Sequence, residues 1–171
     1  MTVERGPLFA DGPHADVDVM VRATVRTLWP LISDIALPAR FSAEFQGTEW
    51  LDEPDVVGAR FRGHNENEFM GQWSAVCTVV QRREPTRFGW VVGDPAQPSA
   101  TWTFELSEHG AKTLLQQRVR LGPGRSGLTA AIAERPDREQ KIIAWRLTDL
   151  RSNMLATVSG IKELAEAPEL P

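Results

Sequence analysis

The side chain with the clearest catalytic chemistry in this sequence is a histidine in its first half. His64 has Glu66 and Glu68 close by, and a histidine with a carboxylate partner can act as a general base near neutral pH. Strict alternation along the predicted strand, however, puts His64 on the face opposite Phe61. Two interpretations of His64 therefore stay open, a catalytic base and an exposed structural residue.

Glu44 is the second candidate for proton transfer. It lies between Phe41 and Phe45 on a predicted short helix that runs from Leu37 to about Phe45. A carboxylate beside two aromatic rings should have a raised pKa, which would let it donate or accept a proton. The alternative is a solvated surface glutamate.

Three uncharged polar residues fall on faces that the pattern turns inward. Gln117 alternates with the apolar residues of its strand, and Asn65 follows Phe61 in phase. Asn153 lies next to Met154 on the last predicted helix. Because a buried polar group without a partner costs about 1 to 3 kcal/mol, each should bond either to the protein's own backbone or to a ligand's carbonyl or hydroxyl.

Large apolar side chains occupy the same inward faces, and the sequence has no tyrosine. Such residues either fill a core or line a pocket for a planar apolar ligand, since small-molecule pockets are usually walled by aromatic and flexible apolar groups. The candidates for ligand contact are Phe41, Phe61, Trp73, Trp90, Trp102, Phe104 and Met154.

Cys77 is the one cysteine, which rules out an internal disulfide and a thiolate metal cluster. We expect it to be a small buried hydrophobic residue. The three histidines lack metal-ligand spacing, and the sequence has no phosphate-binding glycine loop and no nucleophile elbow. The prediction is that the protein uses no metal and no cofactor.

The composition fits one globular domain of 171 residues. A net charge of −4 gives no overall positive field, so nucleic acid is not an expected partner. The first twelve residues lack the apolar core of a secretory signal, and no stretch approaches the ~20 apolar residues of a membrane span. We therefore expect a cytoplasmic protein without stable membrane insertion, either monomer or homodimer.

The periodicity predicts an α+β chain. Alternation from Asp16 to Val21 indicates a half-buried strand, and helical spacing follows from Val25 to Ile32, capped by Thr24 and shortened by Pro30. After the short helix at Leu37 the chain alternates again, with hairpin-length connections that favour an antiparallel sheet of about seven strands. The six further strands are expected at 45–51, 59–65, 72–81, 87–92, 101–106 and 113–121.

A long C-terminal helix is the clearest element. Apolar residues recur every three or four positions from Ile143 to Ala165, and Asp137 with Gln140 resembles a capping box. A helix from about Pro136 to Glu166 would be roughly 45 Å long, so it must lie across the sheet.

Three stretches carry a family resemblance. They are DVDVMVRATVRTLWPLISDIALPARF, GARFRGHNENEFMGQWSAVCTVVQRREPTRFGW and REQKIIAWRLTDLRSNMLATVSGIKELAE. Together they make the chain resemble the START-like (SRPBCC) superfamily, and most closely its bacterial polyketide cyclase/dehydrase group. The resemblance runs from Ala15 to Glu166, and implies one domain at 15–166 between an N-terminal extension, 1–14, and a C-terminal tail, 167–171.

The resemblance implies a helix-grip fold, in which a curved antiparallel sheet wraps around the long C-terminal helix and two short helices follow the first strand. It also implies a cavity between sheet and helix that holds lipids, polyketides, plant hormones or other apolar ligands. Two functions follow. In a polyketide cyclase or dehydratase, Asn65, Gln117 and Asn153 would hold carbonyls while Glu44 or His64 moves the proton. The alternative is a non-catalytic carrier or sensor of a lipid, quinone or other small apolar molecule.

Overall fold

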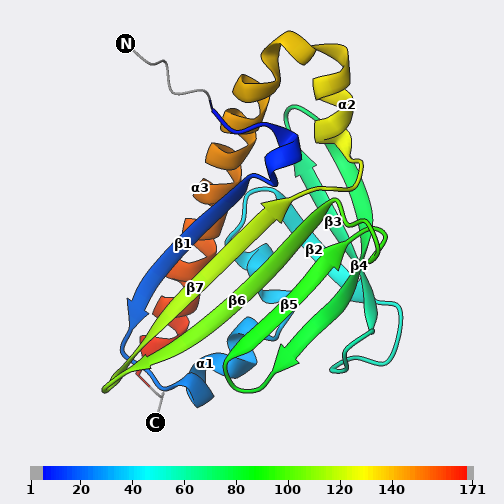
Figure 1. Ribbon diagram of the computed structural model, residues 1–171. Coiled ribbons are helices and arrows are strands. Elements are labelled where there is room, and N and C mark those ends of the chain that lie inside the picture. Colours follow the sequence, from blue (N-terminus) through cyan, green and yellow to red (C-terminus); the bar gives the residue numbers. More distant parts are fainter. Residues whose placement is uncertain (1–5, 169–171) are drawn as a thin grey trace, which may run out of the picture.

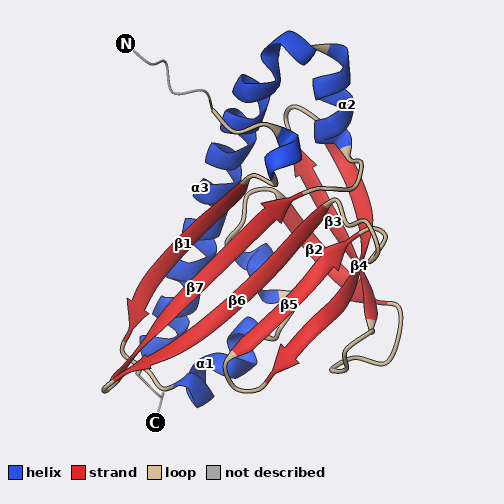
Figure 2. Ribbon diagram, viewed as in Figure 1, coloured by secondary structure: helices blue, strands red, loops and turns tan. Residues whose placement is uncertain are grey.

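A computed structural model describes residues 6–168 as one antiparallel sheet with helices on its inner side (Figures 1 and 2). The seven strands lie in the order β1-β7-β6-β5-β4-β3-β2. The strands are β1 (His14–Val21), β2 (Phe45–Trp50), β3 (Arg60–Asn67), β4 (Gly71–Arg83), β5 (Arg87–Val92), β6 (Ala100–His109) and β7 (Lys112–Leu121). The helices are η1 (Phe9–Asp11), α1 (Val25–Ile32), η2 (Leu37–Arg40), α2 (Gly127–Glu134), η3 (Pro136–Arg138) and α3 (Glu139–Glu166). The predicted helix-grip fold is confirmed.

Helix α3 packs along β1 on the inner side of the sheet, and its first turns extend beyond the end of that strand (Figure 1). Its buried residues recur with helical spacing from Ile143 to Ile161, so the apolar stripe faces the sheet. Helix α1 begins as expected, because the Thr24 hydroxyl accepts a hydrogen bond from the Thr27 N–H at 3.2 Å. It has eight residues, with Pro30 inside it.

Two local predictions are wrong. The helix after Leu37 is a single 3₁₀ turn that ends at Arg40, so Glu44 lies in the connection to β2 and shares no helical face with Phe41. The proposed capping box does not form at the start of α3. Arg138 occupies the cap position without a side-chain cap bond, and Asp137 belongs to the 3₁₀ turn η3.

The space between sheet and helices differs at its two ends. At the packed end, α1 and the second half of α3 join Phe88, Phe104 and Leu115 in a continuous apolar core. At the hollow end, the first half of α3 stands off from Trp90 and Trp102, and a cavity lies between them. We use these two names, packed end and hollow end, throughout.

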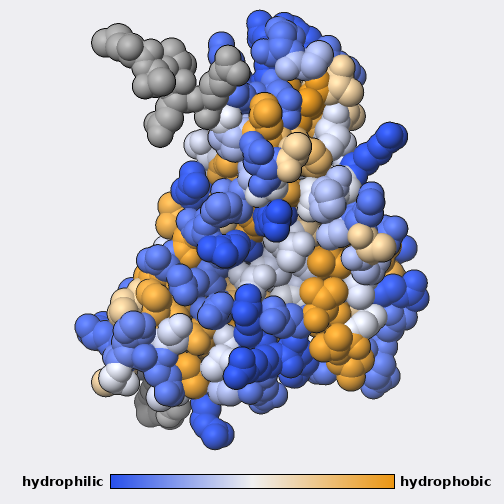
Figure 3. Space-filling view, in the orientation of Figure 1, coloured by the Kyte–Doolittle hydropathy of each residue, from blue (hydrophilic) through white to orange (hydrophobic). Residues whose placement is uncertain are grey.

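The opposite face of the sheet is turned to solvent. Figure 3 shows it from that side, with hydrophilic residues over much of the surface and hydrophobic ones in separate small groups. Val76 and Val80 of β4 are among the exposed apolar residues, while Arg118 of β7 pairs with Asp16 of β1. The sheet is therefore dry on one face and wet on the other, as an antiparallel sheet of this kind allows.

Candidate functional site

A cavity of about 740 Å³ occupies the hollow end. The strands β2 to β7 and the helices α2 and α3 contribute to its wall. Trp90 and Trp102 form part of this wall, with their rings stacked at 9° and 6.0 Å between centroids, and Phe61 meets Trp90 edge-on at 6.1 Å. Such a wall suits a flat apolar molecule, because aromatic rings pack well against one another in stacked or edge-on arrangements.

Exposed residues that also line the cavity mark its mouth. Phe69 and Met70, from the β3–β4 hairpin, meet this condition together with Trp145 of α3. The rings of Phe69 and Trp145 lie 5.5 Å apart, and Met70 packs so closely on Gly127 of α2 that a Cβ there would lie 2.2 Å from the methionine methyl. The mouth is thus framed by the hairpin and the two helices.

Gln117 of β7 lies in the cavity wall, with 4% of its surface exposed. Its side-chain oxygen Oε1 is buried and has no hydrogen-bond partner within residues 6–168. Burial alternates along β7, so Gln117 points inward together with Leu115 and Val119, as predicted from the sequence. A buried acceptor of this kind is one polar group that could fix a ligand's orientation in a pocket whose wall is largely apolar.

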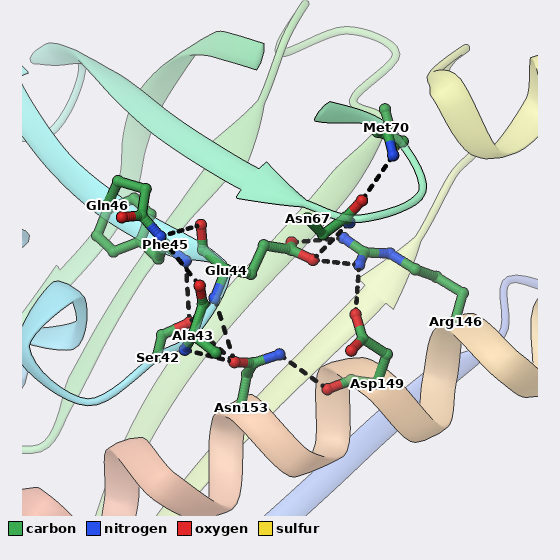
Figure 4. A network of polar contacts seen from close by, with 10 residues as sticks. All are labelled: Ser42, Ala43, Glu44, Phe45, Gln46, Asn67, Met70, Arg146, Asp149 and Asn153. Carbon is green, nitrogen blue, oxygen red and sulfur yellow. Dashed lines mark hydrogen bonds and ion pairs between the residues drawn. The ribbon is translucent and has the colours of Figure 1, made fainter. Parts of the chain in front are cut away.

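A charged cluster lies on the cavity wall beside α3 (Figure 4). The Arg146 guanidinium donates to both carboxylate oxygens of Glu44, with Nη1–Oε2 at 2.5 Å and Nη2–Oε1 at 2.7 Å. It also donates to Asp149 at 3.0 Å, and the Asn67 amide donates to Glu44 at 3.1 Å. The two-pronged contact is the strong form of an arginine–carboxylate pair.

The expected rise in the pKa of Glu44 is wrong. Burial by itself would raise the pKa, but the hydrogen bonds and positive charge of Arg146, with the Asn67 hydrogen bond, outweigh it and leave the pKa below its ordinary value. The pKa of Asp149 shifts in the opposite direction, because partial burial and the nearby charge of Glu44 raise it. Glu44 is therefore held as a carboxylate.

Asn153 serves the protein's own chain. Its Oδ1 accepts hydrogen bonds from the Ala43 N–H at 2.8 Å and the Ser42 hydroxyl at 3.2 Å, and its Nδ2 donates to the Asp149 carbonyl at 3.0 Å. These contacts tie the segment before β2 to α3 (Figure 4). Of the two roles considered for Asn153, the structure places its amide on protein partners, although the residue borders the cavity.

Most of the residues expected in the site come together. The cavity wall contains Glu44, Phe61, Asn65, Trp73, Trp90, Trp102, Gln117, Asn153 and Met154. Three expected residues lie elsewhere. Phe41 packs against Gly160, where an added Cβ would come within 2.3 Å of its ring, and Phe104 is 1% exposed within the core of the packed end.

His64 is the third. It lines a separate small hollow on the outer face, where its Nδ1 is 2.8 Å from the Ser74 hydroxyl and its Nε2 is 3.8 Å from Glu49. Strand alternation explains this position, because neighbouring residues of β3 point to opposite faces. His64 therefore does not reach the cavity that contains Gln117.

Sequence reasoning missed Arg146 and the mouth residues. One signal was available, since Arg146 lies three and seven positions before Asp149 and Asn153, on a helix whose stripe is otherwise apolar. Phe69, Met70 and Trp145 gave no periodic signal.

Cys77 lines the cavity from β4, and burial raises its thiol pKa to about 12. It stays a neutral thiol at physiological pH. Within residues 6–168, no group of three or more histidine, cysteine or acidic side chains could hold a metal ion. No helix in that range is both long and apolar enough to cross a membrane.

Known families and structures resemble this chain over most of its length. Residues 13–147 match a family model described as polyketide cyclase / dehydrase and lipid transport. A polyketide-cyclase-like protein of Corynebacterium glutamicum is 22% identical, with a TM-score of 0.64 over 90% of this chain and 91% of that one. Comparison with curated proteins gave no match.

Two further solved structures show the same fold. The di-domain ARO/CYC BexL of the BE-7585A biosynthetic pathway is 16% identical, with a TM-score of 0.69 over 91% of this chain and 50% of BexL. A START superfamily protein from Mycobacterium smegmatis is also 16% identical, with a TM-score of 0.59 over 88% of this chain and 97% of that one. At these identities the similarity concerns the fold.

Proposed function

The chain belongs to the polyketide cyclase/dehydrase and lipid transport family, and from this premise we propose that its cavity binds one small aromatic or polyketide-like molecule and holds it by a hydrogen bond to Gln117. The observation that carries the proposal is the buried Oε1 of Gln117, which has no donor among the described residues. A ligand hydroxyl or N–H that reaches this oxygen when the Gln117 amide turns toward the cavity would remove the cost of leaving the acceptor unpaired, about 1 to 3 kcal/mol. The stacked indoles of Trp90 and Trp102 would support the flat face of the same molecule.

Binding without chemical change fits the titratable groups of the wall better than catalysis does. The Glu44 carboxylate already accepts three hydrogen bonds, and its lowered pKa keeps it ionised, so it is a poor proton donor. The Cys77 thiol has a pKa of about 12 and is a weak nucleophile at neutral pH. His64 lies on the other face of the sheet. The proposed role is therefore that of a carrier or sensor.

Cyclisation or dehydration is the second candidate. Its support is the Glu44–Arg146 pair on the cavity wall, where the guanidinium could polarise a ligand carbonyl while the carboxylate takes up a proton. This requires the ligand to loosen the contact between the two side chains. Incubation with an aromatic polyketone, followed by mass spectrometry for loss of water, separates the candidates. A product formed by the parent and not by Glu44→Gln would favour the enzyme.

The binding proposal is tested with two probes that differ in one hydroxyl, 2-naphthol and 2-methylnaphthalene. We expect Gln117→Leu to bind 2-naphthol about three- to tenfold more weakly than the parent, which is the range of one net hydrogen bond. Affinity for 2-methylnaphthalene should be unchanged or higher. The melting temperature should not fall, because the substitution removes an unpaired acceptor. A destabilised variant with undiminished affinity for 2-naphthol would remove Gln117 from the site.

Two further variants test whether the probes bind in this cavity. Ala75 of β4 lines the cavity, whereas Val80 of the same strand is exposed on the outer face. Ala75→Trp should fill part of the cavity and weaken both probes, and Val80→Trp should leave both affinities at the parent value. Equal binding by all three proteins would place the site elsewhere.

A further inference from the structure

The charged residues of the cavity wall are unbalanced in sign. The whole chain has a net charge of −4, yet the wall contains four basic side chains and one acidic one. The basic residues are Arg125, Arg138, Lys141 and Arg146, and the acidic residue is Glu44. The wall of this cavity is thus net positive in an acidic protein.

Pairing removes part of that charge and leaves the rest at the mouth. Arg146 is neutralised by Glu44 and Asp149. Arg138 has a carboxylate oxygen of Asp137 at 4.0 Å, the outer limit of an ion pair. Within residues 6–168, Arg125 and Lys141 have no carboxylate within that distance.

The three remaining cations share one place in the fold. Arg125 lies in the loop before α2, Arg138 ends the 3₁₀ turn η3, and Lys141 lies in the first turn of α3, so all three are at the ends of the two helices that frame the mouth. All three residues are exposed, as are the apolar mouth residues Phe69 and Trp145. The mouth therefore combines apolar surface with cations, while the interior wall around Trp90 and Trp102 carries no charged side chain.

We propose that the ligand is an amphipathic anion, whose ring or chain lies in the tryptophan-lined interior while a carboxylate or phosphate at one end is bound at the mouth by Arg125 and Lys141. The inference rests on the proposed function, since it names the class of molecule that the cavity takes. Arginine matches both anions with paired N–H donors, and lysine supplies a point charge to either. The apolar body supplies most of the affinity, and the anionic end sets orientation and preference.

The experiment is calorimetric titration with four naphthalene probes that differ only in the end group: 2-naphthol, 2-naphthoate, 2-naphthyl phosphate and 2-naphthylmethylammonium. For the parent at low salt, we expect one or both anions to bind about three- to fivefold more tightly than 2-naphthol, as partly exposed ion pairs allow. The cation should bind most weakly. The advantage of the anion should shrink at 0.5 M salt because exposed charges are then screened, the screening length being about 10 Å even at 0.1 M. The two anion probes decide between the carboxylate and the phosphate.

The matched variants are Arg125→Gln with Lys141→Gln, and Arg151→Gln as the control. Arg151 is exposed on α3 and lies outside the cavity wall. The double variant should bind the anions no better than 2-naphthol, with 2-naphthol itself unchanged, and the control should behave as the parent. Equal affinity of the parent for 2-naphthol and both anions would overturn the anion proposal and leave the binding function standing. Failure of all four probes to bind would overturn the binding function itself.

Discussion

The two ends of α3 belong to one helix with one apolar stripe, yet they lie in opposite surroundings. In the second half, Val158 and Ile161 are at most 1% exposed and belong to the continuous core with α1. In the first half, Ile143 and Leu150 of the stripe are also buried, but Ile142 and Trp145, which lie beside the stripe, line the cavity. The comparison shows that the spacing of apolar residues determines which side of a helix faces inward. It does not determine whether the residues beside that stripe meet other side chains or a cavity.

The boundary between the two ends is polar. Glu44, Arg146 and Asn153 lie there, and they join the start of β2 to the middle of α3. Met154 belongs both to the cavity wall and to the core, so it marks the same boundary on the apolar side. We infer that the polar contacts hold the first half of α3 at a distance from the sheet that core packing does not itself fix.

The largest expected effect on stability comes from replacing an isoleucine of α3 by alanine, once at the packed end and once at the hollow end. Ile161→Ala should lower the free energy of unfolding by about 3 to 4 kcal/mol, because it leaves a hole in a fully packed core. Ile142→Ala should cost less than about 1 kcal/mol, since the side chain borders a space that already exists. Denaturant melts of the two variants and the parent provide the measurement. Equal losses would mean that the two ends are equally packed.

An intermediate effect is expected at the boundary. Glu44→Ala leaves the mostly buried Arg146 with Asp149 as its remaining partner and should cost about 2 to 3 kcal/mol, somewhat under the usual loss from breaking a buried pair. The double variant Glu44→Leu with Arg146→Met removes both charges and should recover most of that loss. A double variant as unstable as the single one would show that the pair contributes more than charge compensation.

The smallest effect on stability is expected in acid, and it comes from two paired carboxylates, one at the boundary and one at the packed end. The pKa of Glu44 is lowered, and the Arg22 N–H with Lys162 lowers the pKa of Glu166, near the end of α3, to about 2. Above pH 4.5, the ordinary pKa of a glutamate, each of these ionised carboxylates stabilises the fold. That stabilisation is lost as the pH falls through the lowered pKa of the folded state. Asp149, whose pKa is raised, opposes this trend by gaining a proton earlier in the folded state.

The measurement is the free energy of unfolding between pH 5 and pH 2. The parent should lose stability over this range, and Glu44→Gln and Glu166→Gln should each lose less. Glu163→Gln, an exposed neighbour on α3 without an ion pair within residues 6–168, is the control and should follow the parent curve. Parallel curves for all four proteins would show that neither paired carboxylate controls the acid response.

Local patterns were enough to predict the strands, the long helix and the inward direction of Gln117, because each depends on spacing along a single element. The environment of Glu44 was not predictable in the same way. Its partner Arg146 lies 102 residues further on, so the sign of its pKa shift depends on how β2 docks on α3. Alternation likewise placed Trp102 and Phe104 on one face, but only the docking of the helices put one at a cavity and the other in a core.

The sheet order also fixes when the domain can form during synthesis. Among the strands of residues 6–168, β1 pairs with β7 alone, with His14 opposite Arg120 and Val21 opposite Thr113, so the first strand must wait for the last to be made (Figure 1). Until residue 121 has been made, β1 is an alternating strand with unpaired backbone groups and an apolar face, which is the state in which strands pair with other chains. Closing so long a loop is slow on the scale of local folding, so we expect a nascent or truncated chain that ends before β7 to aggregate or to need a chaperone.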